Sequence, residues 1–195
     1  MKKAILIMVI CLLLIPIGCS AVNNAAEEAK PLSAEDFVIN YNGFEFDDTY
    51  PINDLVNTSG ISKGDLENNS GLVSEGPKNG YKRWRLSYPE SDKPQLRLVI
   101  MGYGLSPSEG DCIASAALSD IATSRGIKAG DPSDKVISAY GKPDDKVKGE
   151  AVPLQYVYVF GSKRLVLDID KSGKVVGITY DYNIKKSFQD QGFNE

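Results

Sequence analysis

Alternating apolar side chains in three closely spaced segments restrict the C-terminal half of this chain to an antiparallel meander. Residues 156–160 alternate aromatic side chains with valine, and residues 164–170 and 175–180 each place three apolar side chains on one face. Such a period of two is that of a β-strand. Gly161-Ser162 and Asp170–Gly173 separate the segments and are typical of tight hairpin turns. The pattern predicts three sequential antiparallel strands.

A short amphipathic helix is predicted immediately before these strands. Asp131 is a favourable N-cap, Pro132 suits the first helical position, and Gly141 with Pro143 beyond it ends the helix. One face is apolar and consists of Val136, Ile137 and Tyr140.

The N-terminal half follows the same plan with longer loops. Pro51 and Gly60 are nine residues apart, as are Pro132 and Gly141, and this match indicates an internal repeat. Alternating segments follow at 82–88, 95–100 and 112–118, and residues 37–46 add a strand or an Asn42-Gly43 hairpin before them.

We therefore expect an α+β fold made of two repeats, each a short helix plus a three-stranded antiparallel meander, with the helix covering one sheet face. The first repeat covers residues 36–120 and the second covers residues 121–184. Residues 185–195 form a polar C-terminal segment.

The N-terminal segment has the composition of a secretory signal peptide. Lys2 and Lys3 precede an apolar run from Ala4 to Ile17, which is shorter than the roughly 20 residues that a membrane-spanning helix requires. The run ends in Ile17-Gly18-Cys19-Ser20, which resembles the lipobox of bacterial lipoproteins. That resemblance implies a signal peptide at 1–18 and lipid attachment at Cys19.

Pro16 departs from the lipobox pattern, in which an unhindered apolar residue precedes the cysteine by three positions. The alternative is cleavage after Ala21, which would release a secreted protein beginning at Val22. Residues 19–35 contain few large apolar side chains and are predicted to form a flexible tether.

A second resemblance covers the start of the C-terminal repeat. Residues 123–131 read T-x-x-G-I-x-x-G-D, and the helix that follows ends in Y-G-x-P at residues 140–143. This phrase resembles one found in small lipoproteins of Gram-positive bacteria. The helix-then-meander plan is also similar to BamE-like lipoproteins and to the beta-lactamase inhibitor protein fold, and it implies a binding or scaffolding module without a shared catalytic site.

Composition excludes several classes of function. The formal net charge of −4, without a basic cluster, argues against nucleic-acid binding. The chain contains no histidine, which removes Ser-His-Asp and Cys-His catalysis and the usual zinc sites. Cys112 remains alone once Cys11 leaves with the signal peptide and Cys19 is acylated, and we interpret it as a small buried hydrophobic residue. We expect no cofactor.

Two sets of residues are candidates for partner binding. Arg83 and Arg85 flank Trp84 on a predicted strand and would bind an acidic partner surface, or would form a solvated stripe above a buried tryptophan. Tyr156 and Tyr158 would form an exposed aromatic platform if the helix covered the opposite face, but we favour a core position for them, on a central strand covered on both faces.

Two further patterns have simpler interpretations. Residues 168–173 match the start of a calcium loop, D-x-D-x-S-G, but the twelfth position is Thr179 and the hairpin interpretation is preferred. The carboxylates that could serve catalysis are dispersed in predicted loops: Asp65, Glu67, Asp144 and Asp145.

The sequence predicts a lipid-anchored, non-catalytic binding or scaffolding module on the extracytoplasmic face of the cell membrane. Its expected partners are the membrane, through the lipid, and another envelope or secreted protein; the loops at 62–80 and 102–111 are further contact candidates. The first alternative is a proteinaceous inhibitor of a secreted enzyme, and the second is a carboxylate-dependent envelope enzyme.

Overall fold

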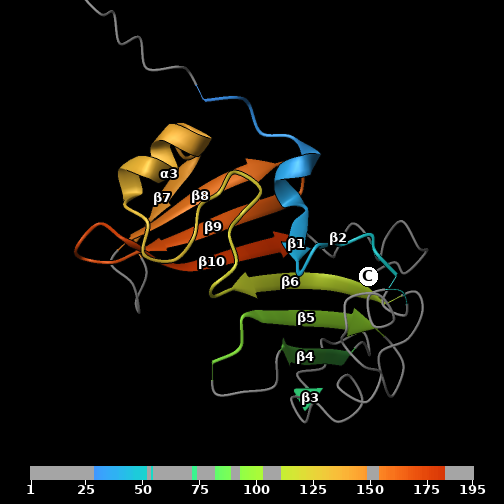
Figure 1. Cartoon of the computed structure of the whole chain (residues 1–195). Coiled ribbons are helices and arrows are strands. Elements are labelled where there is room, and N and C mark those ends of the chain that lie inside the picture. The colour runs from blue at the N-terminus through green and yellow to red at the C-terminus, as the bar shows by residue number, and fades with distance from the viewer. Residues whose placement is uncertain are drawn as a thin grey trace, which may run out of the picture.

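The protein is built on one antiparallel sheet, as the computed structural model in Figure 1 shows. The structure describes residues 29–51, 54, 72–73, 82–88, 93–102, 111–148 and 154–182. Within these residues the sheet contains eight strands in the order β3-β4-β5-β6-β10-β9-β8-β7. Their bounds are Leu72–Val73 (β3), Lys82–Tyr88 (β4), Leu96–Gly102 (β5), Cys112–Leu118 (β6), Asp145–Val147 (β7), Leu154–Phe160 (β8), Lys163–Ile169 (β9) and Val175–Tyr182 (β10).

The predicted α+β fold of two helix-plus-meander repeats is wrong. Strand β6 of the first meander pairs with strand β10 of the second, with Leu118 opposite Ile178 and Ala116 opposite Tyr180, so the two meanders form one continuous sheet. In the described part of the chain there is one α-helix, α3 (Ser133–Tyr140), and the helix predicted from Pro51 to Gly60 lies outside the described residues except for Pro51 and Asp54. Pairing β6 with β10 satisfies backbone groups that two separate sheets would leave on open edges.

The helix and the N-terminal elements pack on the same face of the sheet. They are α3, the 3-10 helix η1 (Ala34–Phe37) and the hairpin β1 (Ile39–Tyr41) with β2 (Phe44–Phe46). Phe37, Ile39 and Val136 are 0–2% exposed and share one core with the sheet. Figure 1 shows α3 and η1 over the half of the sheet formed by β8, β9 and β10. The hairpin predicted at Asn42-Gly43 is confirmed, with φ values of 52° and 82°.

The predicted helix before the second meander is confirmed, although its first turn differs. Pro132, rather than Asp131, occupies the N-cap position, and the Asp131 carboxylate instead accepts hydrogen bonds from Lys128 N at 2.9 Å and Lys135 Nζ at 2.8 Å. Gly141 ends the helix with φ 78° and ψ −163°, and its N–H donates to Ile137 O at 2.8 Å. This backbone conformation is essentially restricted to glycine, which accounts for glycine at this position.

The aromatic face of the second meander is core. Tyr156 is 7% exposed and Tyr158 is 1% exposed, so the core position favoured for them is confirmed, and the alternative of an exposed partner-binding platform is wrong. Tyr158 donates a hydrogen bond to Gly141 O at 3.0 Å and packs against Tyr140, with ring centroids 5.2 Å apart. The expectation that this strand is central and covered on both faces holds only for its middle, where Val157 on the opposite face is 9% exposed. β8 lies next to the terminal strand β7, and Val159 on it is 43% exposed.

Candidate functional site

The structure describes only some of the residues that were predicted to form functional sites. Cys19 lies outside the described residues. Arg83 and Arg85 lie on β4, in register with Met101 and Val99 of β5, and their side chains lie outside what the structure describes. The loops at 62–80 and 102–111 fall almost wholly outside the described residues.

The calcium-loop pattern forms a hairpin turn. Asp170 Oδ1 accepts hydrogen bonds from Ser172 N at 2.8 Å, Ser172 Oγ at 2.7 Å and Lys174 N at 2.9 Å. These bonds, that from Lys174 N above all, hold the pKa of Asp170 below its usual range. Asp168 Oδ1 accepts from Gln155 Nε2 at 2.8 Å on a neighbouring strand. The carboxylates of this segment therefore stabilise the turn and the sheet.

Two of the four dispersed carboxylates, Asp144 and Asp145, lie in the described part of the chain. Asp144 Oδ2 accepts a hydrogen bond from Val159 N at 2.7 Å, and Asp145 lies on the exposed strand β7. Asp65 and Glu67 lie outside the described residues. Asp144 thus has a structural role at the end of β8.

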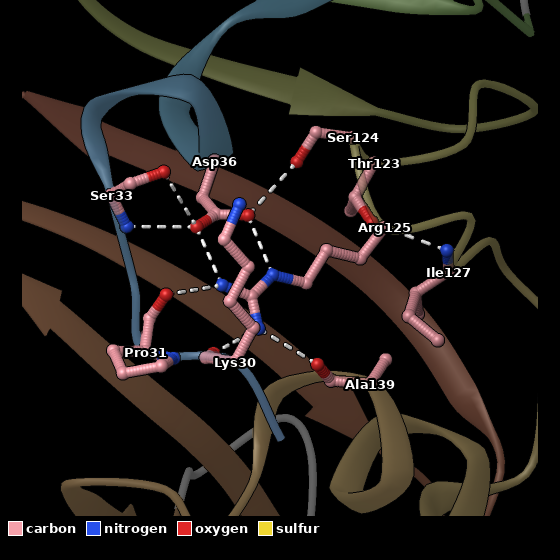
Figure 2. A network of polar contacts seen from close by, with 9 residues as sticks. All are labelled: Lys30, Pro31, Ser33, Asp36, Thr123, Ser124, Arg125, Ile127 and Ala139. Carbon is pink, nitrogen blue, oxygen red and sulfur yellow. Dashed lines mark hydrogen bonds and ion pairs between the residues drawn. The ribbon is translucent and has the colours of Figure 1, made fainter. Parts of the chain in front are cut away.

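The most extensive polar network in the described part of the chain surrounds the guanidinium of Arg125 (Figure 2). Arg125 Nε lies 2.6 Å from Asp36 Oδ1, and Arg125 Nη2 lies 2.7 Å from Asp36 Oδ2. The two side chains are 14% and 7% exposed. The arrangement is a bidentate, largely buried ion pair between residues 89 positions apart in the sequence.

The remaining guanidinium donors bind main-chain carbonyls from two other segments. Nη1 donates to Lys30 O at 2.6 Å and to Ala139 O at 2.8 Å, and Nη2 donates to Pro31 O at 2.9 Å. The guanidinium carbon also lies 4.9 Å from the centroid of the Tyr140 ring. All five N–H donors of Arg125 are thereby used inside the protein. We call this network of Arg125, Asp36 and the carbonyls of Lys30, Pro31 and Ala139 the N-terminal clamp.

Local sequence positions both charged partners of the N-terminal clamp. Asp36 completes a capping box at the start of η1, where Ser33 N donates to Asp36 Oδ2 at 2.8 Å. Arg125 sits in a tight turn closed by Thr123 N to Ile127 O at 2.8 Å and by Ile127 N to Thr123 Oγ1 at 3.2 Å. The T-x-x-G-I segment singled out in the sequence is thus the turn that aims Arg125 at the N-terminal segment.

The electrostatics of the N-terminal clamp favour the charged forms of both groups. Burial by itself raises the pKa of Asp36, but the hydrogen bonds from Arg125 and Ser33 outweigh it, and the pKa lies below its usual value. The hydrogen bond to Asp36 raises the pKa of Arg125. Neither group has a free donor or acceptor directed at a substrate, so the clamp is a structural attachment and not a catalytic centre.

Sequence reasoning did not predict the N-terminal clamp. The capping-box spacing from Ser33 to Asp36 was available as a local signal, and so was the arginine inside the T-x-x-G-I segment. Neither signal identifies the other residue as its partner.

A shallow groove runs beside the N-terminal clamp, between η1, the β1–β2 hairpin and residues 121–124. Glu35 and Glu45 line it together with the Asn40 amide, which donates to Glu45 Oε1 at 3.4 Å. Ser124 also lines the groove and donates its hydroxyl to Asp36 Oδ1 at 3.3 Å, but that carboxylate is already paired with Arg125.

Comparison with known proteins finds only distant similarity. No protein-family model and no curated protein matches the chain. Among solved structures, it is similar to a cysteine-rich secretory protein from Staphylococcus aureus, with a TM-score of 0.36 and 14% identity over 64% of this chain and 44% of that chain. It is also similar to a DUF4309 family protein from Bacillus subtilis, with a TM-score of 0.35 and 14% identity over 62% of this chain and 78% of that chain.

The chain spans less than half the length of the first of these proteins. Similarities of this size do not identify a shared function. Within the described residues, no helix is sufficiently long and apolar to cross a membrane.

Proposed function

We propose that this chain is a lipid-anchored, extracytoplasmic, non-catalytic binding module whose partner is another envelope protein. The lipobox-like segment ending at Cys19 supports the anchor. The net charge of −4 leaves the lipid, and not electrostatic attraction to anionic headgroups, as the membrane contact.

The observation that carries the proposal is the N-terminal clamp. Arg125 donates hydrogen bonds to the carbonyls of Lys30 and Pro31, which lie at the start of the described part of the chain. Four of the five hydrogen bonds of Arg125 go to residues 30–36 and the fifth goes to Ala139 on α3, so the guanidinium joins the N-terminal segment to the rest of the fold. Such an attachment suits a domain that is held through its N-terminus. It also shortens the proposed tether, since residues 30–35 belong to the fold and not to the linker.

The shorter tether places the domain close to the membrane. Residues 20–28 span at most about 30 Å when fully extended. A module with this reach binds a partner that is itself at the membrane surface or in the adjacent envelope layer.

The test is the chemical state of the mature N-terminus. The full chain is expressed in a Gram-positive host, and the intact mass of the membrane-associated product is measured beside a Cys19→Ala control. The expected product begins at Cys19 and carries a diacylglyceryl group, and the control is not acylated. An unacylated product beginning at Val22 would overturn the anchor. A Pro16→Leu variant reports whether the proline limits processing.

A further inference from the structure

One end of the sheet is an exposed edge formed by β7 and the last residues of β8. Strand β7 is the terminal strand of the described sheet and lies beside β8 (Figure 1). All three residues of β7 are exposed, and residues 158–160 of β8 extend beyond its pairing with β7. Val147 and Val159 at this edge are 39% and 43% exposed. Exposed strand edges with β-branched apolar side chains are templates for pairing with another strand.

The direction of the main-chain groups at this edge follows from one hydrogen bond. Val159 N donates to Asp144 Oδ2 at 2.7 Å, and Asp144 precedes β7 on the side of β8 opposite β9, so Val159 N points out of the sheet edge. Because the N–H direction alternates along a strand, Val157 N points to the same side, toward Asp145. The pair Asp145↔Val157 is therefore hydrogen-bonded and the next pair along β7 is not. It follows that the N–H and C=O groups of Lys146 point away from β8, out of the edge.

The outward N–H groups of Val159 and Lys146 are both bonded to carboxylates. Asp144 accepts from Val159 N, and Asp145 Oδ1 accepts from Lys146 N at 2.7 Å. The Lys146 ammonium lies 4.8 Å from the centroid of the Tyr156 ring and therefore does not cover the carboxylates. An approaching strand would have to displace both carboxylates before its C=O groups could accept from these N–H groups.

We propose that Asp144 and Asp145 block strand addition to this edge by a second copy of the chain. A second copy brings an identical edge, and two identical antiparallel edges can pair about a two-fold axis. The carboxylates occupy the N–H groups that the second copy would need, and they place negative charge where its C=O oxygens would approach. This role does not depend on the lipid anchor, since it uses only contacts within the folded domain.

The test measures self-association of the full chain by sedimentation velocity in a density-matched detergent. The open-edge variant carries Asp144→Ala and Asp145→Ala, which remove both acceptors. The matched control carries Asp144→Asn and Asp145→Asn, which remove the same two charges but keep a side-chain oxygen for each N–H group. A third variant adds Lys146→Pro to the open-edge variant and so deletes the outward N–H group of β7.

We expect the open-edge variant to self-associate at least about tenfold more tightly than wild type, because each freed N–H group can bond to a C=O group of the second copy. The asparagine control should stay within about threefold of wild type, since its side-chain oxygens still accept from the edge. The added proline should return the open-edge variant to within about threefold of wild type, because proline offers no N–H group to the second copy.

Three results would overturn the proposal. The first is an open-edge variant that keeps the wild-type circular dichroism spectrum and self-associates no more tightly than wild type. The second is equal self-association by the alanine and asparagine variants, which would assign the effect to net charge. The third is an open-edge variant that self-associates as tightly with the added proline as without it.

The single variants Asp144→Ala and Asp145→Ala keep the comparison measurable if the double variant unfolds. Each frees one N–H group and should self-associate more tightly than wild type and more weakly than the open-edge variant. Wild-type behaviour of both single variants would also overturn the proposal.

Discussion

Removing the Arg125 guanidinium should cost a large part of the stability of the fold. In Arg125→Met, the Asp36 carboxylate stays 7% exposed in the wild-type geometry and keeps only Ser33 N at 2.8 Å and the weaker contacts from Ser33 Oγ and Ser124 Oγ. Breaking a buried ion pair by removing one partner costs about 3–5 kcal/mol. The surviving hydrogen bonds and the 14% exposure of Arg125 reduce this cost, so we expect about 2–4 kcal/mol.

The assay is urea unfolding of the full chain followed by circular dichroism. Arg164→Met is the matched control, because the Arg164 and Asp181 side chains are 57% and 34% exposed and such pairs contribute about 0–1 kcal/mol. A double-mutant cycle with Asp36→Asn should give a coupling free energy of about 1–3 kcal/mol between positions 36 and 125. Amide hydrogen exchange over residues 33–38 should accelerate in the same variant.

The reasoning would be refuted by an Arg125→Met variant as stable as the Arg164→Met control. It would also be refuted by additive effects of the two substitutions in the cycle, since additivity means that the two residues do not interact.

Three further outcomes follow from particular residues. The pKa of Asp36 is lower in the folded chain than in the unfolded chain, so the stabilisation that its carboxylate provides is complete above about pH 4 and is lost as the pH falls through the folded-state pKa. The urea midpoint of wild type should therefore fall more steeply in acid than the urea midpoint of Asp36→Asn. Parallel curves of midpoint against pH would contradict this. Gly141→Ala should cost about 1–3 kcal/mol in thermal unfolding, because φ 78° and ψ −163° strain any residue with a Cβ atom, and an unchanged melting temperature would exclude that strain. Cys112 is 8% exposed, and burial raises the pKa of its thiol to about 11. At about pH 8 a thiol reagent should therefore label Cys112 only after the chain unfolds. Rapid labelling of the native chain would show that the thiol is accessible.

Much of the local structure could be predicted from the sequence. The strands at 82–88 and 112–118 coincide with β4 and β6, and the turn at Asp170–Gly173 forms with Gly173 at φ 77°. The burial of Cys112 was also predicted correctly. These features depend on side-chain periodicity and on backbone conformations that few residues adopt, and both are readable within a window of ten residues.

The candidate site could not be predicted in the same way. Tyr156 and Tyr158 lie on a strand whose two faces are both apolar, and the pattern alone does not say which face the helix covers. The N-terminal clamp depends on a contact between residues 36 and 125, and no local pattern connects them.

The sequence by itself determined where strands β4, β5, β6, β8, β9 and β10 and the α3 helix lie and which residues of each of these strands share a face, whereas β3 and β7 were assigned to loops. Only the tertiary structure decided that the two meanders join through β6 and β10 into one sheet and that Arg125 closes on Asp36. The reason is physical. Every strand offers the same backbone donors and acceptors along its edges, so periodicity specifies the faces of a strand but not its neighbour. The choice of neighbour depends on burial of the whole core, which includes Phe37, Val136 and Tyr180 together.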